Sequence, residues 1–171
     1  RHLRAVGITA DVVNGNGRRY PAHVLDAAVQ DLRTHLHESA GQGRAMLLLG
    51  EAEHPSDKGG HPNLLETVVR WDQVAFDGAQ VILEGTVLET SKGRDILALL
   101  EGGVTPDISQ RGYGTSVIVK EDGKQVEEVT ALTITGYDLV VDGADPNAGI
   151  TMVEATAEAV PTIQEQEERP M

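Results

Sequence analysis

A chain of 171 residues is long enough for one domain with a hydrophobic core, because domains commonly span about 100–200 residues. Apolar side chains make up 40% of the chain and aromatic ones only 3%, so the core must consist mainly of Val, Leu, Ile and Ala. The 27 acidic and 14 basic side chains give a net charge of −13, which argues against a nucleic-acid binder. The lack of cysteine excludes disulfides and thiolate metal sites. No apolar run approaches the roughly 18 residues of a membrane span.

The beginning of the chain predicts a strand, a turn and a helix. Loose alternation of apolar and polar residues predicts a strand over Leu3–Val13, and Asn14–Gly17 is a strong turn signal. Pro21 suits the first turn of a helix, and apolar residues at helical spacing predict that this helix runs over Ala22–Ser39. Because the chain starts at Arg1, we expect a fragment or a processed product, and no signal peptide is visible in it.

The middle of the chain predicts three strands and a second helix. The short apolar run Ala45–Leu49 is typical of a buried strand. Two further strands, Leu65–Val74 and Ala79–Leu88, are joined at Asp77-Gly78, which is a good hairpin signal. A helix is predicted over Lys92–Glu101, with capping residues before it and a glycine pair after it.

Two further strands are predicted towards the C-terminus. They cover Thr115–Lys120 and Val126–Leu139, and Gly136 in the second one indicates a bulge or a close approach of another chain segment. The remaining sequence loses its periodicity and becomes rich in Ala, Thr and Glu. We therefore expect one domain over residues 1–153 and a flexible acidic tail over residues 154–171.

A serine in the stretch Pro106–Gly114 is a candidate nucleophile. Ser109 lies among apolar and β-favouring residues and is followed closely by glycines. A serine hydroxyl becomes a nucleophile when a neighbouring base takes its proton, and glycines let the backbone approach a substrate carbonyl. The alternative is an ordinary turn serine, so the hypothesis depends on finding a base and an orienting carboxylate elsewhere in the chain.

A histidine and an aspartate could supply those two groups. His54 follows a buried strand and precedes Pro55, and histidine is the usual general base near neutral pH. Asp138 lies in an apolar strand, where a carboxylate is costly to bury unless it is paired. A surface loop histidine and a partly exposed strand aspartate are the respective alternatives.

A metal site is a second interpretation of the loop that contains His54. Carboxylate and imidazole side chains are acceptable zinc ligands, although here they lack a helical frame that would hold them. The residues concerned are Glu51, Glu53, His54, Asp57 and His61.

Four stretches in the same order resemble one protein family. They are Val12–Pro21, Gly50–Pro55, Ile108–Gly114 and Gly136–Val141, the last followed by Pro146. Together they resemble the prohead core proteases, or capsid maturation proteases, of tailed phages, with the T-even type as the nearest. The order and spacing match over nearly the whole globular part of the chain.

The resemblance implies a serine endopeptidase related in fold to the herpesvirus assembly proteases. By matching position, Ser109 is the nucleophile, His54 the general base and Asp138 the third member of a triad. His61 is a rival for the third position, because the herpesvirus enzymes use a second histidine there. Gln110 stands where the family often has a second serine, which leaves the first serine as the residue carried over.

The resemblance also implies an oxyanion site, a specificity and a fold. Backbone N–H groups of Arg111 and Gly112 are expected to bind the oxyanion, and no cofactor or metal is expected. Such proteases cut after glutamate and process themselves, so Glu165 is a predicted self-cleavage site. The expected fold is α+β, with a mostly antiparallel curved sheet or barrel, as in the herpesvirus proteases, and two flanking helices.

Scaffold or core proteins and the major capsid protein are the implied substrates, inside the prohead in the infected host cytoplasm. A homo-oligomer is plausible, and no nucleic acid or membrane is expected as a partner. Two rival functions remain open, namely an inactive structural β-domain of a phage particle and a metal-dependent hydrolase. Substitution of Ser109 and sensitivity to chelators would distinguish them.

Overall fold

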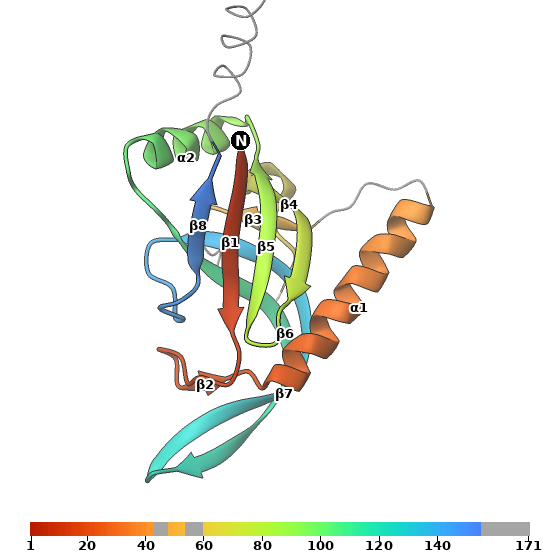
Figure 1. The fold of residues 1–171 in the computed structure, drawn as a ribbon, viewed down its shortest axis with the longest axis vertical. Helices are drawn as coiled ribbons and strands as arrows, with labels where there is room; N and C mark the ends of the chain where they lie inside the picture. The colour runs from red at the N-terminus through yellow and green to blue at the C-terminus, as the bar shows by residue number, and fades with distance from the viewer. Residues whose placement is uncertain (43–47, 54–59, 155–171) are drawn as a thin grey trace, which may run out of the picture.

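Alternating buried and exposed side chains build a curled sheet of eight strands, as the computed structural model shows for residues 1–42, 48–53 and 60–154 (Figure 1). The strands are β1 (His2–Thr9), β2 (Arg18–Arg19), β3 (Leu49–Glu51), β4 (Thr67–Phe76), β5 (Gln80–Val87), β6 (Asp107–Glu121), β7 (Lys124–Val140) and β8 (Gly149–Val153). The helices are α1 (Ala22–Gly41), α2 (Ser91–Glu101) and the short 3₁₀ helix η1 (Leu64–Glu66).

The order of strands in the sheet is β2-β7-β6-β8-β1-β5-β4-β3. All neighbours are antiparallel except β2 and β7, which run parallel. The sheet curls so far that β3, at one end of the order, reaches β7 near the other end. A parallel bridge joins Ala52 to Leu139, and the backbone N–H of Glu53 donates to the carbonyl of Leu139 at 2.6 Å. The predicted α+β fold with a curved, mostly antiparallel sheet and two helices is therefore confirmed.

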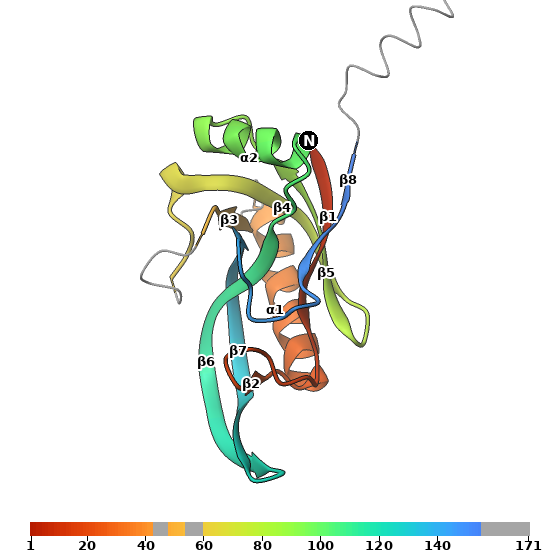
Figure 2. The same cartoon turned by 90° about the vertical axis from the view of Figure 1, so that its left-hand side faces the viewer.

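The hydrophobic core lies inside the curl and is covered by α1. Figure 2 shows α1 between the ribbon formed by β6 and β7 and the strands β1 and β5. Its apolar face, with Leu25, Val29 and Leu36, belongs to the same core cluster as the buried residues of the sheet. Trp71 is completely buried, and its indole N–H donates to the carbonyl of Tyr137 at 2.9 Å, which ties β4 to β7.

Turn and cap signals in the sequence mark the ends of the central elements correctly. The carboxylate of Asp77 accepts the N–H groups of Ala79 and Gln80 in the β4–β5 hairpin. Thr90 caps α2 by accepting the N–H of Gly93, and Gly102 ends that helix. Within the described residues, no helix is long and apolar enough to cross a membrane.

Several boundaries differ from the sequence-based prediction. The first strand ends at Thr9 instead of Val13, because Asp11 adopts a left-handed conformation with φ of 63° and turns the chain towards α1. Of the strand predicted over Ala45–Leu49, only Leu49 lies in β3, which extends two residues further to Glu51, and residues 45–47 lie outside the described part. Neither β2 nor β8 was predicted.

The two longest strands, β6 and β7, form a ribbon that projects beyond the rest of the sheet (Figure 2). Their register shifts between Arg111 and Gly112, where Arg111 faces Gly136 and Gly112 faces Ile134. A Cβ at Gly136 would lie 2.7 Å from the carbonyl oxygen of Leu49, so the bulge and close approach predicted at Gly136 are both present. Ser109 lies within β6, so it is a strand residue and not a turn residue.

Candidate active site

Ser109 and Asp138 are direct cross-strand neighbours in the antiparallel pair of β6 and β7. Cross-strand partners point to the same face of a sheet. Arg111 lies two residues further along β6 than Ser109, so its side chain points to that face as well. Ser109 is the third residue of β6, and Asp138 is the third residue from the end of β7. The ladder between these two strands therefore brings a hydroxyl, a carboxylate and a guanidinium together on one face.

Asp138 is completely buried and both of its carboxylate oxygens accept hydrogen bonds. Oδ1 accepts the backbone N–H of Glu51 at 2.8 Å. Oδ2 accepts Nε of Arg111 at 3.1 Å and Nη2 of the same side chain at 2.7 Å. Pairing and hydrogen bonding offset the cost of burying the charge, so the alternative of a partly exposed strand aspartate is wrong.

Arg111 is the centre of a buried group of charges. Its side chain is 1% exposed, and besides Asp138 it contacts Oε2 of Glu51 through Nη2 at 2.8 Å. Nη1 donates to the backbone carbonyl of His61 at 3.4 Å. The guanidinium thus connects β6, β7, β3 and the segment that precedes η1. From sequence, Arg111 was singled out only for its backbone.

Glu51 completes this group, which we call the Arg111 network and define as Glu51, Arg111 and Asp138. Glu51 is 5% exposed, and its Oε2 also accepts the backbone N–H of Asn63 at 3.1 Å. The network holds one cation and two carboxylates out of water. A basic residue on one strand and acidic residues on two others are the sequence signals that could have indicated such a network, which was not predicted.

The chain on both sides of residues 54–59 is fastened to β7. Before this segment, the carboxylate of Glu53 accepts the N–H of Val141 at 3.1 Å, and Glu53 has a φ of 64°, which is uncommon outside glycine. After it, the carbonyl of Gly60 accepts the hydroxyl of Thr135 at 3.0 Å. The predicted base His54 itself lies outside the described residues, as does Asp57.

The two described acidic residues of the metal-site interpretation, Glu51 and Glu53, point to other partners. Glu51 faces Arg111, and Glu53 bonds to the end of β7. Among residues 1–42, 48–53 and 60–154, no three His, Cys, Asp or Glu side chains lie in an arrangement that would hold a metal ion.

Gly112, one of the two predicted oxyanion donors, is packed tightly against β7. A Cβ at this position would lie 2.4 Å from the carbonyl oxygen of Thr133, so no side chain fits without movement of the backbone. The neighbouring Gln110 accepts the phenolic O–H of Tyr137 at 2.8 Å, and its Nε2 is buried without a partner among the described residues. Burial raises the pKa of the Tyr137 phenol, which therefore stays protonated and able to donate.

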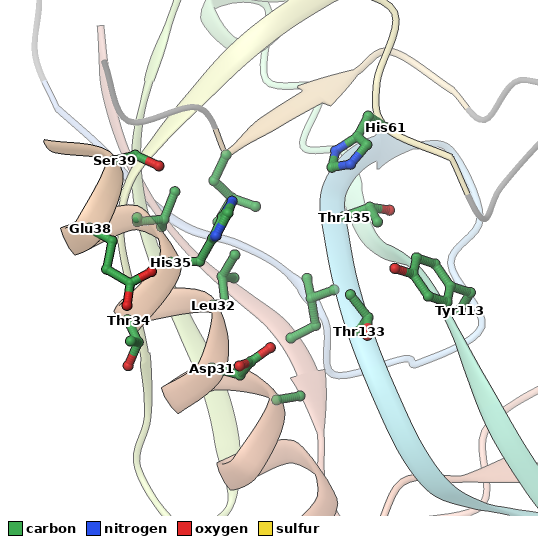
Figure 3. Close-up of a pocket in the computed structure, with 14 residues that line it drawn as sticks. Asp31, Leu32, Thr34, His35, Glu38, Ser39, His61, Tyr113, Thr133 and Thr135 are labelled. Atoms are coloured by element: carbon green, nitrogen blue, oxygen red, sulfur yellow. The ribbon is translucent and has the colours of Figure 1, made fainter. Parts of the chain in front are cut away.

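Two cavities lie near these residues. A polar one of about 240 Å³ is lined by Ser109, Gln110 and Gly112, together with Arg18 and Tyr20 from the N-terminal segment. A larger groove of about 850 Å³ runs between α1 and β7. Figure 3 shows its walls, with residues of α1 on one side and His61, Tyr113, Thr133 and Thr135 on the other. His61 and Ser109 thus line different cavities.

Known proteins with a similar sequence or structure agree on the kind of protein this is. The structure of the bacteriophage T4 capsid assembly protease matches with a TM-score of 0.67 and 22% identity, over 81% of this chain and 80% of that one. The prohead core protein protease of Enterobacteria phage T4 is 28% identical over 158 residues, which cover 91% of this chain and 70% of that protein.

The curled sheet with its two helices therefore has the fold of a capsid assembly protease. A family described as prohead core protein serine protease matches residues 2–159. This match covers nearly the whole chain, so the chain belongs to the prohead core protein serine protease family and is a phage serine protease.

Proposed function

We propose that this protease cleaves peptide bonds after glutamate, with Ser109 as nucleophile, His54 as general base and Asp138 as the third member of the triad. In this mechanism His54 takes the proton of Ser109 as the serine oxygen attacks the scissile carbonyl. The imidazolium then gives a proton to the leaving amine, while Asp138 holds the tautomer of the ring and stabilises its charge. Water and the same base release the acyl group in the second half of the reaction.

The observation that carries this proposal is the position of Asp138 beside Ser109 in the ladder of β6 and β7. The same carboxylate accepts the N–H of Glu51, three residues before His54. The backbone of Glu53, directly before His54, bonds to Leu139. Residues 51–53 therefore contact Asp138 and its neighbour Leu139, and His54 is the next residue of the chain.

Backbone N–H groups of Arg111 and Gly112 are proposed to stabilise the oxyanion, an effect worth about 10²–10³ in rate for each donor. Packing against β7 requires a glycine at position 112, because a Cβ there would lie 2.4 Å from the carbonyl oxygen of Thr133. Gln110 stands between Ser109 and these donors and is bonded to Tyr137, which keeps its side chain on the opposite face of β6.

Core and capsid proteins of the phage are the proposed substrates, cut inside the prohead during its maturation. The protease of phage T4, to which this chain is similar, is described as a prohead core protein protease. Self-cleavage after Glu165 remains part of the proposal, and that residue lies outside the described part of the chain.

Two alternatives are less well supported. His61 as the third member of the triad is less well supported, because Asp138 is the cross-strand neighbour of Ser109, whereas the side chain of His61 lines the groove between α1 and β7. An inactive structural domain would not need a buried carboxylate paired with the serine position.

The experiment that tests the proposal compares the wild-type protein with Ser109→Ala on a peptide that carries Ile-x-Glu. We expect mass spectrometry to show cleavage after glutamate by the wild type and none by the variant. Ser116→Ala is a matched control, because Ser116 lies on the same strand and its exposed hydroxyl bonds to Glu127. Cleavage by Ser109→Ala at the wild-type rate would remove Ser109 from the mechanism.

A further inference from the structure

We propose that Arg111 is a positioning residue for the reaction, which holds the carboxylate of Asp138 in a single orientation beside Ser109, and that Glu51 in turn holds Arg111. This inference rests on the proposed function, because it requires Asp138 to take part in the reaction. Arg111 and Glu51 contact other protein groups, and we propose that they affect the reaction through Asp138.

The geometry of the contacts fixes the plane of the carboxylate. Arg111 donates to Oδ2 of Asp138 through two nitrogens, Nε and Nη2, so two N–H groups of the guanidinium converge on one carboxylate oxygen. Oδ1 on the other side is held by the backbone N–H of Glu51 at 2.8 Å. With donors on both oxygens, the side chain of Asp138 cannot rotate without breaking hydrogen bonds in a buried place.

Arg111 is itself held by groups from two other segments. Oε2 of Glu51 accepts Nη2 at 2.8 Å, and the carbonyl of His61 accepts Nη1 at 3.4 Å. Glu51 is fixed by the N–H of Asn63. The orientation of Asp138 therefore depends on a chain of contacts that runs from β7 through β6 to β3 and to the start of η1.

The arrangement of charges also argues for a role beyond holding strands together. Burying one cation and two carboxylates costs several kcal/mol of desolvation, and apolar packing commonly holds strands together at lower cost. Here the charges are concentrated at the cross-strand neighbour of Ser109. Nη2 of Arg111 contacts both carboxylates, so the cation lies between Asp138 and Glu51 and reduces the repulsion between them.

Lysine cannot replace arginine in this position without loss of orientation. Its ammonium group is a single point donor, whereas the fork of Arg111 reaches Asp138 and Glu51 at the same time. We therefore expect Arg111→Lys to retain the charge but to lower kcat by roughly 10- to 100-fold, the loss that follows when the hydrogen-bond partner of a metal-binding side chain is changed. KM should stay within about twofold, since the network makes no proposed contact with the substrate.

The decisive measurement is a double-mutant cycle on kcat with the peptide substrate. It uses Arg111→Lys, Asp138→Asn and the double variant. If Arg111 acts through Asp138, then Arg111→Lys has little further effect in the Asp138→Asn background. Equal effects of Arg111→Lys in both backgrounds would overturn the proposal, and so would an Arg111→Lys variant with wild-type kcat.

Controls separate a loss of function from a loss of folding. Arg70→Lys is the matched control, because Arg70 forms an exposed ion pair with Asp72 and should leave kcat unchanged. If Arg111→Lys does not fold, Glu51→Gln replaces it in the same cycle, because this change keeps the size of the side chain while weakening its hold on Arg111. Additive effects of Glu51→Gln and Asp138→Asn would then overturn the proposal.

The same assay distinguishes failure of this inference from failure of the proposed function. Ser109→Ala with wild-type cleavage would overturn the proposed function and the inference with it. An inactive Ser109→Ala together with additive changes at Arg111 and Asp138 would leave the serine mechanism in place and overturn only the positioning role.

Discussion

Tyr137 is completely buried on the inner face of β7, and its O–H donates to Gln110 at 2.8 Å. Burial raises the pKa of this phenol above its ordinary value of 10.0, so the folded protein keeps the proton when the unfolded chain releases it. Above about pH 10 the unfolded state therefore binds fewer protons than the folded state, and the free energy of unfolding falls as pH rises.

This residue gives a test of pH dependence. We expect the free energy of unfolding of the wild type to fall more steeply above about pH 10 than that of Tyr137→Phe, which has no phenol to titrate. At neutral pH the variant should be destabilised by about 1 kcal/mol, because a hydrogen bond is lost. Urea unfolding at several pH values measures both effects, and parallel curves for the two proteins would contradict the prediction.

Reasoning from sequence identified Ser109 and Asp138 as a pair, and the structure places them opposite each other, while their chemical roles stay predictions. The role of the Arg111 side chain escaped that reasoning. Arg111 shares a face of β6 with Ser109, and this face meets Asp138 only in the observed pairing, because a shift of one residue would move its side chain to the other face. Gly136 indicated a bulge in β7, but the sequence does not show which residues of β6 pair with which residues of β7.

The approach of β3 to β7 is the contact between elements that places Glu51 and Glu53. It depends on Gly50, where a Cβ would lie 1.9 Å from the carbonyl oxygen of Tyr137. That oxygen belongs to the backbone and also accepts the indole N–H of Trp71, so it cannot move away easily. A methyl group at this position must push β3 away from β7.

We therefore expect Gly50→Ala to destabilise the protein by about 1–3 kcal/mol, the usual cost of overpacking, and to lower activity together with stability. Thermal unfolding followed by circular dichroism measures the change. Gly41→Ala is the control, because no atom lies within 4 Å of its Cβ position at the end of α1. Equal melting temperatures for the two variants would show that the close contact has no energetic consequence.

The long periodic elements were predictable from sequence, and the short ones were not. The helix α1 and the β4–β5 hairpin carry apolar periodicity and clear turn or cap residues over many positions. By contrast, β2 has only two residues, and β8 follows a glycine-rich and aspartate-rich loop that is typical of irregular structure. Such short strands form because they pair with neighbouring strands of the sheet. Their own sequence therefore does not predict them.

At the scale of the whole molecule, closure of the sheet joins distant parts of the chain. Glu51 and Asp138 are 87 residues apart in sequence, whereas Arg111 and Asp138 in the β6–β7 ribbon are 27 apart. Closing a longer loop costs more conformational entropy, so the ribbon should form before β3 joins β7.

Trp71 is the single tryptophan of the chain and bonds to β7 across the closed sheet, so its fluorescence should report this closure. On refolding from urea, we expect cleavage activity to return with the rate constant of the Trp71 signal and later than the gain of β-structure seen by circular dichroism. Activity that returns before the Trp71 signal would contradict this order. Protein that has not been unfolded should show full cleavage activity from the start of the assay.

The contact between β3 and β7 has a consequence for the chain while it is being made. β7 is among the last strands to leave the ribosome, with only β8 after it in the described part of the chain. Before β7 emerges, Ser109 on β6 has left the ribosome without Asp138 beside it, and β3 lacks the strand on which it docks. Because the proposed mechanism needs both Ser109 and Asp138, we expect a nascent chain that lacks β7 to have no cleavage activity.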